Sequence, residues 1–175
     1  MPNPHLSILV VDDAKFSSAM IGRSLRQAGY QDIRFAHSAA DALRHVQDGD
    51  TIVVPTDVGE PPALLTALSE QRTRFKGVEV SQILPVRRFG YFDPATVQHV
   101  RHTAYFFGGA SRAGGQEGWV DYRASYFSEM PQLIERGLMP ADVVFTLASP
   151  MDEHGYFALS LGPDYTMAAI SKARA

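Results

Sequence analysis

The first third of the chain alternates between strand-like and helix-like patterns of hydrophobic residues. Residues 7–11 (SILVV) form a short apolar run, which is typical of a parallel strand covered on both faces. Apolar residues then recur at helical spacing over 16–28, and Gly29 predicts the end of that helix. Asp13 lies between the two segments, and we expect it to cap the N-terminus of the helix.

The same alternation continues through a second helix to a third strand. Residues 33–36 predict a strand, and Ser38 predicts the capped start of a helix that ends at Gly49. Residues 51–54 predict the third strand. The order β-α-β-α-β requires right-handed crossovers, so the sequence predicts an α/β fold with a parallel sheet and flanking helices.

Beyond Pro55 the pattern becomes less regular, although strands and helices still alternate. The last predicted helix starts at Tyr165 and meets no stop signal before Ala175, so we expect the chain to be a piece cut from a longer one. The pattern predicts helices over 62–68 and 127–136 and strands over 78–84, 103–107, 143–147 and 156–161.

Composition and net charge argue against several classes of function. The chain has 175 residues, of which 45% are hydrophobic and 20% are charged, as in an ordinary globular domain. A net charge of -3 gives no general attraction to nucleic acid or to an anionic membrane. The chain has no cysteine, no apolar run long enough to span a bilayer and no signal-peptide pattern. We therefore expect a cytoplasmic protein.

Acidic residues at the predicted strand ends suggest one candidate site. Asp12 and Asp13 end the first strand, and Asp57 follows the third. Carboxylates at neighbouring strand tips can hold Mg²⁺ in the crevice where α/β sheets bind ligands. The simpler explanation, which the residues alone favour, is that Asp13 caps a helix and Asp12 is solvated.

Glycine-rich turns suggest a second candidate site. Gly59, Glu60 and Pro61 lie just before a proline-opened helix, where backbone amides can bind an anion. Five glycines fall within 108–118, a loop that also contains Arg112, which can donate two hydrogen bonds to phosphate. An ordinary turn and a flexible surface loop remain alternatives for the two segments.

Two polar motifs resemble catalytic or metal sites but lack the required spacing. Ser149, Asp152 and His154 are too close in sequence for a hydrolase triad, whose side chains must converge. His99 and His102 are three residues apart and have no partner cluster, so we expect a structural role for this pair.

Residues 6–48 resemble the start of a response-regulator receiver domain. LSILVVDDAKFSSAMIGRSLRQAGYQDIRFAHSAADAL carries Asp12 and Asp13 where that family has its acidic metal-binding pair, and Asp57 followed by Pro61 matches its phosphoacceptor spacing. The resemblance implies Mg²⁺-dependent phosphorylation of Asp57. The family also needs a lysine before a proline, and none of the three lysines here precedes one.

Residues 39–175 resemble the N-terminal domain of the acetyl-CoA hydrolase/transferase family, in its 4-hydroxybutyrate CoA-transferase-like branch. GDTIVVPTDVGEPPALLTAL, YFFGGASRAGGQEG and ASPMDEHGYFALSLGPDYTMAA carry the likeness through their order and spacing. The resemblance implies an acyl-CoA site that includes Gly59, Glu60 and Pro61 and also Gly108, Gly109 and Arg112. It implies acyl-CoA and a carboxylic acid as substrates.

In that family a glutamate of a second domain attacks the thioester, so the resemblance implies little activity without that domain or a second subunit. We also expect a homo-oligomer. The two resemblances divide the chain into a receiver-like segment, 1–48, and a CoA-transferase-like domain, 49–175, with an overlap at 39–61. Whether the chain is a fusion, a truncation or a chimera stays open. Acyl-CoA binding is the leading function, and phosphorylation at Asp57 is the alternative.

Overall fold

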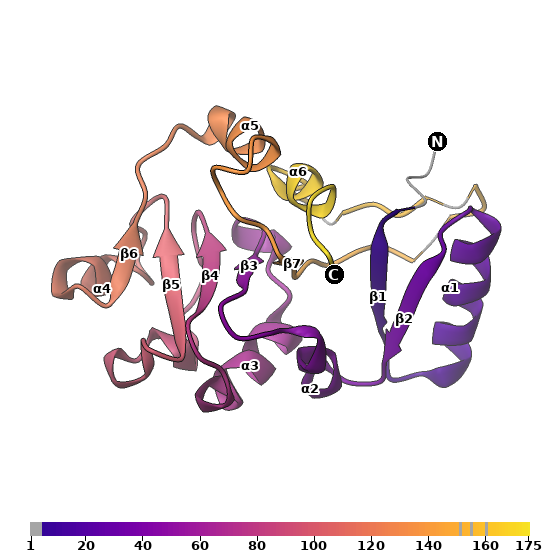
Figure 1. Cartoon of the computed structure of the whole chain (residues 1–175), viewed down its shortest axis with the longest axis horizontal. Helices are drawn as coiled ribbons and strands as arrows, with labels where there is room; N and C mark the ends of the chain where they lie inside the picture. The colour runs from indigo at the N-terminus through magenta and orange to yellow at the C-terminus, as the bar shows by residue number, and fades with distance from the viewer. Residues whose placement is uncertain (1–4, 151, 155, 160) are drawn as a thin grey trace.

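Two parallel sheets form the framework of the protein (Figure 1). The computed structural model describes residues 5–150, 152–154, 156–159 and 161–175. A two-stranded sheet pairs β1 (Ser7–Val11) with β2 (Asp32–Ala36). The second sheet has the order β6-β5-β4-β3-β7, and all its pairs are parallel. Its strands are β3 (Thr51–Val53), β4 (Val78–Gln82), β5 (Val100–Ala104), β6 (Val120–Tyr122) and β7 (Val143–Val144). The predicted parallel α/β fold is therefore confirmed.

Helix α1 (Lys15–Gln27) covers the two-stranded sheet with a narrow buried face. Ser18, Gly22 and Leu25 are its buried positions. Phe16 and Met20, which the apolar pattern includes in the packed face, are 79% and 57% exposed. With only two strands beneath it, the helix has too little sheet surface to bury the wider apolar stripe.

The predicted cap of α1 is wrong by one residue. Ala14 is the N-cap and gives no side-chain hydrogen bond. The carboxylate that serves this turn belongs to Asp12, whose Oδ1 accepts from the Ala14 amide at 2.9 Å. Asp13 is left exposed to solvent.

The junction between the two sheets begins with a capped helix, as predicted. Ser38 Oγ accepts from the Asp41 amide at 3.0 Å and starts α2 (Ala39–Ala42). A 3-10 turn, Leu43–His45, continues α2 and ends the helical stretch before the predicted Gly49. Leu43 and Val46 pack in the core of the five-stranded sheet. The second helix therefore belongs to the larger sheet.

The five-stranded sheet lies between two helical layers because its buried strands alternate their faces. Ile52 and Val54 pack on one side with α3 (Pro62–Glu70), whereas Val53 packs on the other side with α5 (Met130–Glu135) and α6 (Thr166–Ile170). In Figure 1 the strands run up the page, with α5 and α6 toward their upper ends and α3 toward their lower ends. Among the described residues, no helix is both long and apolar enough to cross a bilayer.

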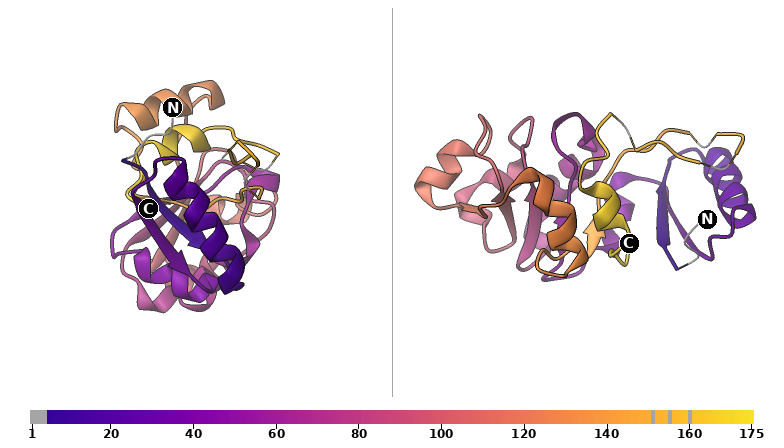
Figure 2. Two further views of the ribbon diagram at one scale, coloured as in Figure 1. Left: turned by 90° about the vertical axis from the view of Figure 1, so that its right-hand side faces the viewer. Right: turned by 90° about the horizontal axis from the view of Figure 1, so that it is seen from above.

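The long axis of the molecule runs across both sheets. The β1–α1–β2 unit stands at one end of this axis, and α4 (Arg112–Glu117) stands at the other, beyond β6 (Figure 2). The segment between β7 and α6 reaches back from the larger sheet toward the β1–α1–β2 unit (Figures 1 and 2).

Several predicted boundaries in the second half are wrong. The strand expected at 103–107 is β5, at Val100–Ala104, and the strand expected at 143–147 keeps only Val143–Val144. The described residues of 156–161 form no strand. The last helix ends at Ile170, because the chain then turns back to β7, where the Val144 amide donates to the Ala175 carbonyl at 3.0 Å.

Candidate functional site

The loops that follow β3, β4 and β5 share one edge of the sheet. These strands are neighbours and parallel, so their carboxyl ends point the same way. The turn at 57–61 follows β3 and the glycine-rich loop at 108–112 follows β5, with the loop after β4 between them. The structure therefore brings the two predicted glycine segments to one edge.

The turn at 57–61 contains a 3-10 turn, and two of its backbone amides donate to carbonyl groups close by in the chain. The Gly59 amide donates to the Thr56 carbonyl and the Glu60 amide donates to the Asp57 carbonyl, both at 3.1 Å. A Cβ on Gly59 would lie 2.6 Å from Cβ of Pro55, so close packing requires this glycine. These two amides shape the edge of the site and do not face a ligand.

Glu60 is a buried link between two loops. Its Oε2 accepts from Gln82 Nε2 at 3.0 Å and from the Val86 amide at 3.1 Å. Burial raises the pKa of Glu60 above its ordinary value, while the hydrogen bonds from Gln82 and Val86 act against this shift. The carboxylate thus ties the turn after β3 to the loop after β4.

Leu84 joins the same turn to the glycine-rich loop. Its carbonyl accepts from the Asp57 amide at 3.1 Å. A Cβ on Gly108 would lie 2.3 Å from Leu84 Cδ1, so a larger residue there would have to displace the end of the Leu84 side chain. Gly109 faces open space, and the exposed Arg112 donates from Nη2 to the Phe107 carbonyl at 3.2 Å. Gly109 and Arg112 are the members of this loop that remain open to solvent.

Asp164 and Tyr165, at the start of α6, form hydrogen bonds with the loops after β3 and β4. The Tyr165 hydroxyl donates to the Val54 carbonyl at 2.5 Å and accepts from the Ile83 amide at 3.3 Å. Asp164 Oδ2 accepts from the Thr56 amide at 2.8 Å. Neither residue is a predicted site residue, because a single tyrosine and a single aspartate at the start of a helix give no sign of such distant partners.

An apolar cavity of about 300 Å³ opens at the same edge. Four segments of the chain contribute to its wall: the loops after β3, β4 and β5 and the stretch that leads into α5. The lining residues are Thr56, Ile83, Leu84, Tyr105, Phe106, Ser125, Phe127 and Met130. This cavity could not be predicted from the sequence, since no local pattern joins the four segments.

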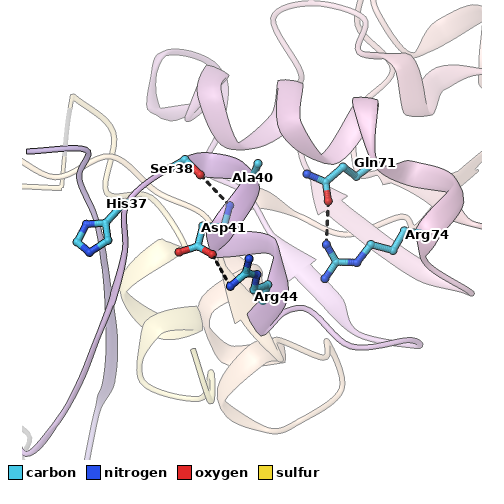
Figure 3. Close-up of a pocket in the computed structure, with 7 residues that line it drawn as sticks. All are labelled: His37, Ser38, Ala40, Asp41, Arg44, Gln71 and Arg74. Atoms are coloured by element: carbon cyan, nitrogen blue, oxygen red, sulfur yellow. Dashed lines mark hydrogen bonds and ion pairs between the residues drawn. The ribbon is translucent and has the colours of Figure 1, made fainter.

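A second hollow, of about 410 Å³, lies between α2 and the end of α3 (Figure 3). Arg44 Nη1 lies 2.9 Å from Asp41 Oδ1, and Arg74 Nη1 donates to Gln71 Oε1 at 2.8 Å. Figure 3 shows each guanidinium turned toward its partner. The hollow contains no residue of either predicted site, and its lining is His37, Ser38, Ala40, Asp41, Arg44, Gln71 and Arg74.

The structure does not bring Asp57 together with Asp12 and Asp13. β1 belongs to the two-stranded sheet, whereas β3, which Asp57 follows, pairs with β4 and β7 in the other sheet. Within the described ranges, no three His, Cys, Asp or Glu side chains gather as a metal site would require. The phosphoacceptor alternative therefore gains no support from the fold.

The motif around Ser149 forms a turn. Asp152 Oδ1 accepts from the amides of His154 at 2.9 Å and Tyr156 at 2.8 Å, and Ser149 Oγ accepts from the Ala158 amide at 2.9 Å. The serine and aspartate therefore hold backbone groups, in agreement with the argument against a triad. Met151 and Gly155 of this motif lie outside the described residues.

Comparisons with known proteins agree on one kind of relative. Residues 20–175 match the family described as acetyl-CoA hydrolase/transferase N-terminal domain. A succinyl-CoA:cyclohexane-1-carboxylate CoA transferase of Geobacter metallireducens is 40% identical over 140 residues, which are 78% of this chain and 31% of that protein. A 4-hydroxybutyrate coenzyme A transferase of Clostridium kluyveri is 29% identical over 137 residues, covering 78% of this chain and 32% of that protein.

The solved structures give the same result for the fold. The crystal structure of RipA from Yersinia pestis superposes with a TM-score of 0.69 at 26% identity, over 78% of this chain and 34% of that one. The chain thus spans about a third of the length of the relatives it matches.

Proposed function

This chain belongs to the acetyl-CoA hydrolase/transferase N-terminal domain family, and from that premise we propose that it forms the acyl-CoA-binding side of a CoA-transferase or acyl-CoA hydrolase site. The site lies at the carboxyl ends of β3, β4 and β5. The observation that carries the proposal is that both glycine segments and an apolar cavity meet at this one edge.

The residues of the proposed site have two roles, which follow from whether each residue is packed against neighbouring loops or faces solvent. Gly59, Glu60 and Pro61 fix the shape of the edge, because the turn and the Glu60 carboxylate are tied to neighbouring loops. Gly108 permits close packing, whereas Gly109 and Arg112 face solvent. In the proposed complex the Arg112 guanidinium binds a phosphate of CoA, since a guanidinium can donate two parallel hydrogen bonds to such a group.

Turnover requires more than this chain in our proposal. The matched part of this chain covers only about a third of each relative, and the family resemblance assigns the attacking glutamate to a second domain. We propose that such a domain, or another subunit of a homo-oligomer, completes the site in the cytoplasm and that a carboxylic acid accepts the CoA. We also propose that the β1–α1–β2 segment is a separate unit from the CoA-binding domain.

Calorimetric titration with CoA tests the binding proposal directly. We expect CoA to bind the wild-type chain, and Arg112→Ala to weaken binding about tenfold or more, because a hydrogen bond to a charged group contributes about 1.5–3 kcal/mol. Arg23→Ala is the matched control, because Arg23 is also exposed but lies on α1. No binding heat from CoA, or equal affinities for the two variants, would contradict the proposal.

A further inference from the structure

The apolar cavity at the sheet edge adjoins the loops of the proposed CoA site. Leu84 lines the cavity, and the same residue contacts the glycine-rich loop and accepts from the Asp57 amide. Thr56, another lining residue, directly precedes the turn at 57–61. A ligand bound at these loops therefore has the cavity within reach.

The wall of the cavity carries no charge. Five of its eight lining residues are Ile83, Leu84, Phe106, Phe127 and Met130, and the other three carry only hydroxyl groups. A carboxylate that entered would lose its water without a positive residue in the wall, which is costly in an apolar environment, and Arg123 beside Tyr105 is already paired with Glu79 at 2.8 Å. An alkyl or alicyclic chain would instead gain free energy as its surface left water.

Among the described residues, two of the three hydroxyl oxygens in the wall have no hydrogen-bond partner, and one of them is Thr56 Oγ1. The Tyr105 hydroxyl lies 3.0 Å from Ser81 Oγ and is therefore paired. Ser125 Oγ is buried and has no hydrogen-bond partner within the described part of the chain. Buried hydroxyls in native proteins are normally satisfied, so these two oxygens call for a partner that the described residues do not supply, either a water molecule or a ligand.

We propose that this cavity holds the acyl group of an uncharged, apolar acyl-CoA, and that the Ser125 hydroxyl donates to the thioester carbonyl oxygen. The inference rests on the proposed function and adds the substrate class to it: apolar monocarboxylic acyl groups are preferred over dicarboxylic ones. Small-molecule sites span roughly 300–1,000 Å³, so a cavity of about 300 Å³ suits an acyl group of several carbons and excludes the CoA nucleotide.

Binding of matched acyl-CoAs to the whole chain tests the substrate class. Hexanoyl-CoA and adipoyl-CoA have the same six-carbon chain and differ by a terminal carboxylate. We expect hexanoyl-CoA to bind at least about tenfold more tightly than either CoA or adipoyl-CoA. Butyryl-CoA should lie between CoA and hexanoyl-CoA, because each buried methylene contributes about a factor of four in affinity.

The outcomes separate this inference from the function on which it rests. If CoA binds but hexanoyl-CoA and adipoyl-CoA bind equally, or adipoyl-CoA binds more tightly, the assignment of the cavity is overturned and CoA binding stands. If neither CoA nor any acyl-CoA binds, the proposed function fails and the inference falls with it.

Variants of exposed aromatic residues locate the acyl group without disturbing the core. Phe106 and Phe127 line the cavity but are 56% and 57% exposed, so Phe106→Ala and Phe127→Ala should fold normally. We expect each to reduce the preference for hexanoyl-CoA over CoA about fivefold or more. Phe16→Ala on α1 is the matched control and should keep the wild-type preference. Unchanged preference in both cavity variants overturns the proposal.

Ser125→Ala tests the role assigned to the hydroxyl. If Ser125 donates to the thioester carbonyl, the variant should bind butyryl-CoA and hexanoyl-CoA more weakly by a similar factor of about three to ten, because both carry the same thioester. Ser149→Ala, a change in an exposed turn, is the matched serine control. Equal affinities of wild type and Ser125→Ala for both acyl-CoAs would overturn this role.

Discussion

His102 lies on β5 with its imidazole fully buried and with neither ring nitrogen hydrogen-bonded within the described residues. Its ring packs against Phe92, with centroids 4.6 Å apart, and near Tyr91. Burial lowers the pKa of His102 to about 3. The residue therefore acts as a neutral aromatic core side chain, which agrees with the structural role that the sequence predicted for the His99 and His102 pair.

This burial makes the fold sensitive to acid. The unfolded chain binds a proton at His102 near its ordinary pKa of about 6.5, and the folded chain does so only near 3, so the contribution of His102 to stability is lost as the pH falls from 6.5 toward 3. Between pH 7 and pH 5 the free energy of unfolding should fall by about 2 kcal/mol from this group alone.

Urea unfolding at the two pH values measures this loss. His102→Phe keeps an aromatic ring but cannot titrate, so its stability should fall by about 2 kcal/mol less than that of wild type over the same interval. His154→Gln changes an exposed histidine and should keep the wild-type difference. Identical pH dependence in wild type and His102→Phe would show that the buried imidazole is not the cause.

At the scale of elements, the sequence predicts strands well where burial is continuous and poorly where it is not. The apolar runs of β1 and β3 were located correctly because both faces of each strand are hydrophobic in the sequence. β5 was displaced because polar His102 and Thr103 occupy its buried positions while hydrophobic Phe106 and Phe107 follow it. β6 is not predicted because only Val120 of its three residues is buried, and Asp121 interrupts any apolar run.

Some features of the candidate site can also be predicted from the sequence, and others cannot. The glycine turns follow from local sequence, since turn chemistry and strand order are local properties. The Tyr165 contacts join segments more than eighty residues apart in the chain, and the cavity joins residues from Thr56 to Met130. Such contacts are products of tertiary packing, and local patterns contain no information about them.

Tyr165 should stabilise the site edge through its hydroxyl. Tyr165→Phe removes the hydrogen bonds to the Val54 carbonyl and from the Ile83 amide, and we expect a loss of about 1–3 kcal/mol in the free energy of unfolding. CoA affinity should fall as well, because the loops after β3 and β4 lose a common anchor. Tyr126→Phe alters an exposed tyrosine and should change stability by less than about 0.5 kcal/mol. Denaturant unfolding and calorimetry would measure both effects, and equal stability of the two variants would argue against the anchor.

On the scale of the whole molecule, the two sheets have separate cores. Two clusters of buried side chains hold the five-stranded sheet, and among the described residues none before Ala39 belongs to either cluster or packs against it as a partly buried hydrophobic. Leu43 and Val46 lie in the larger core. We therefore propose that the boundary between the units falls between β2 and α2, within the overlap of the two sequence resemblances or just before it.

Deletion of residues 1–36 tests this division. The remaining chain, 37–175, should fold cooperatively and bind CoA with an affinity within about threefold of the full chain, because both its core clusters and its site are intact. Leu25→Ala in the full chain is a complementary variant, which should loosen only the β1–α1–β2 unit. Circular dichroism and calorimetry provide the measurements, and an unfolded or non-binding deletion product would refute the proposed boundary.

The cap at Ser38 has a consequence for how such chains can be assembled. Ser38 has an extended backbone, with φ -158° and ψ 161°, and its own side chain starts the helix that follows. Extended backbone is also how any strand ends, so a strand from an unrelated protein can be grafted upstream of Ser38 without a new backbone conformation. Ser38 therefore marks a position at which one βα unit can be exchanged for another without changing the start of the helix that follows.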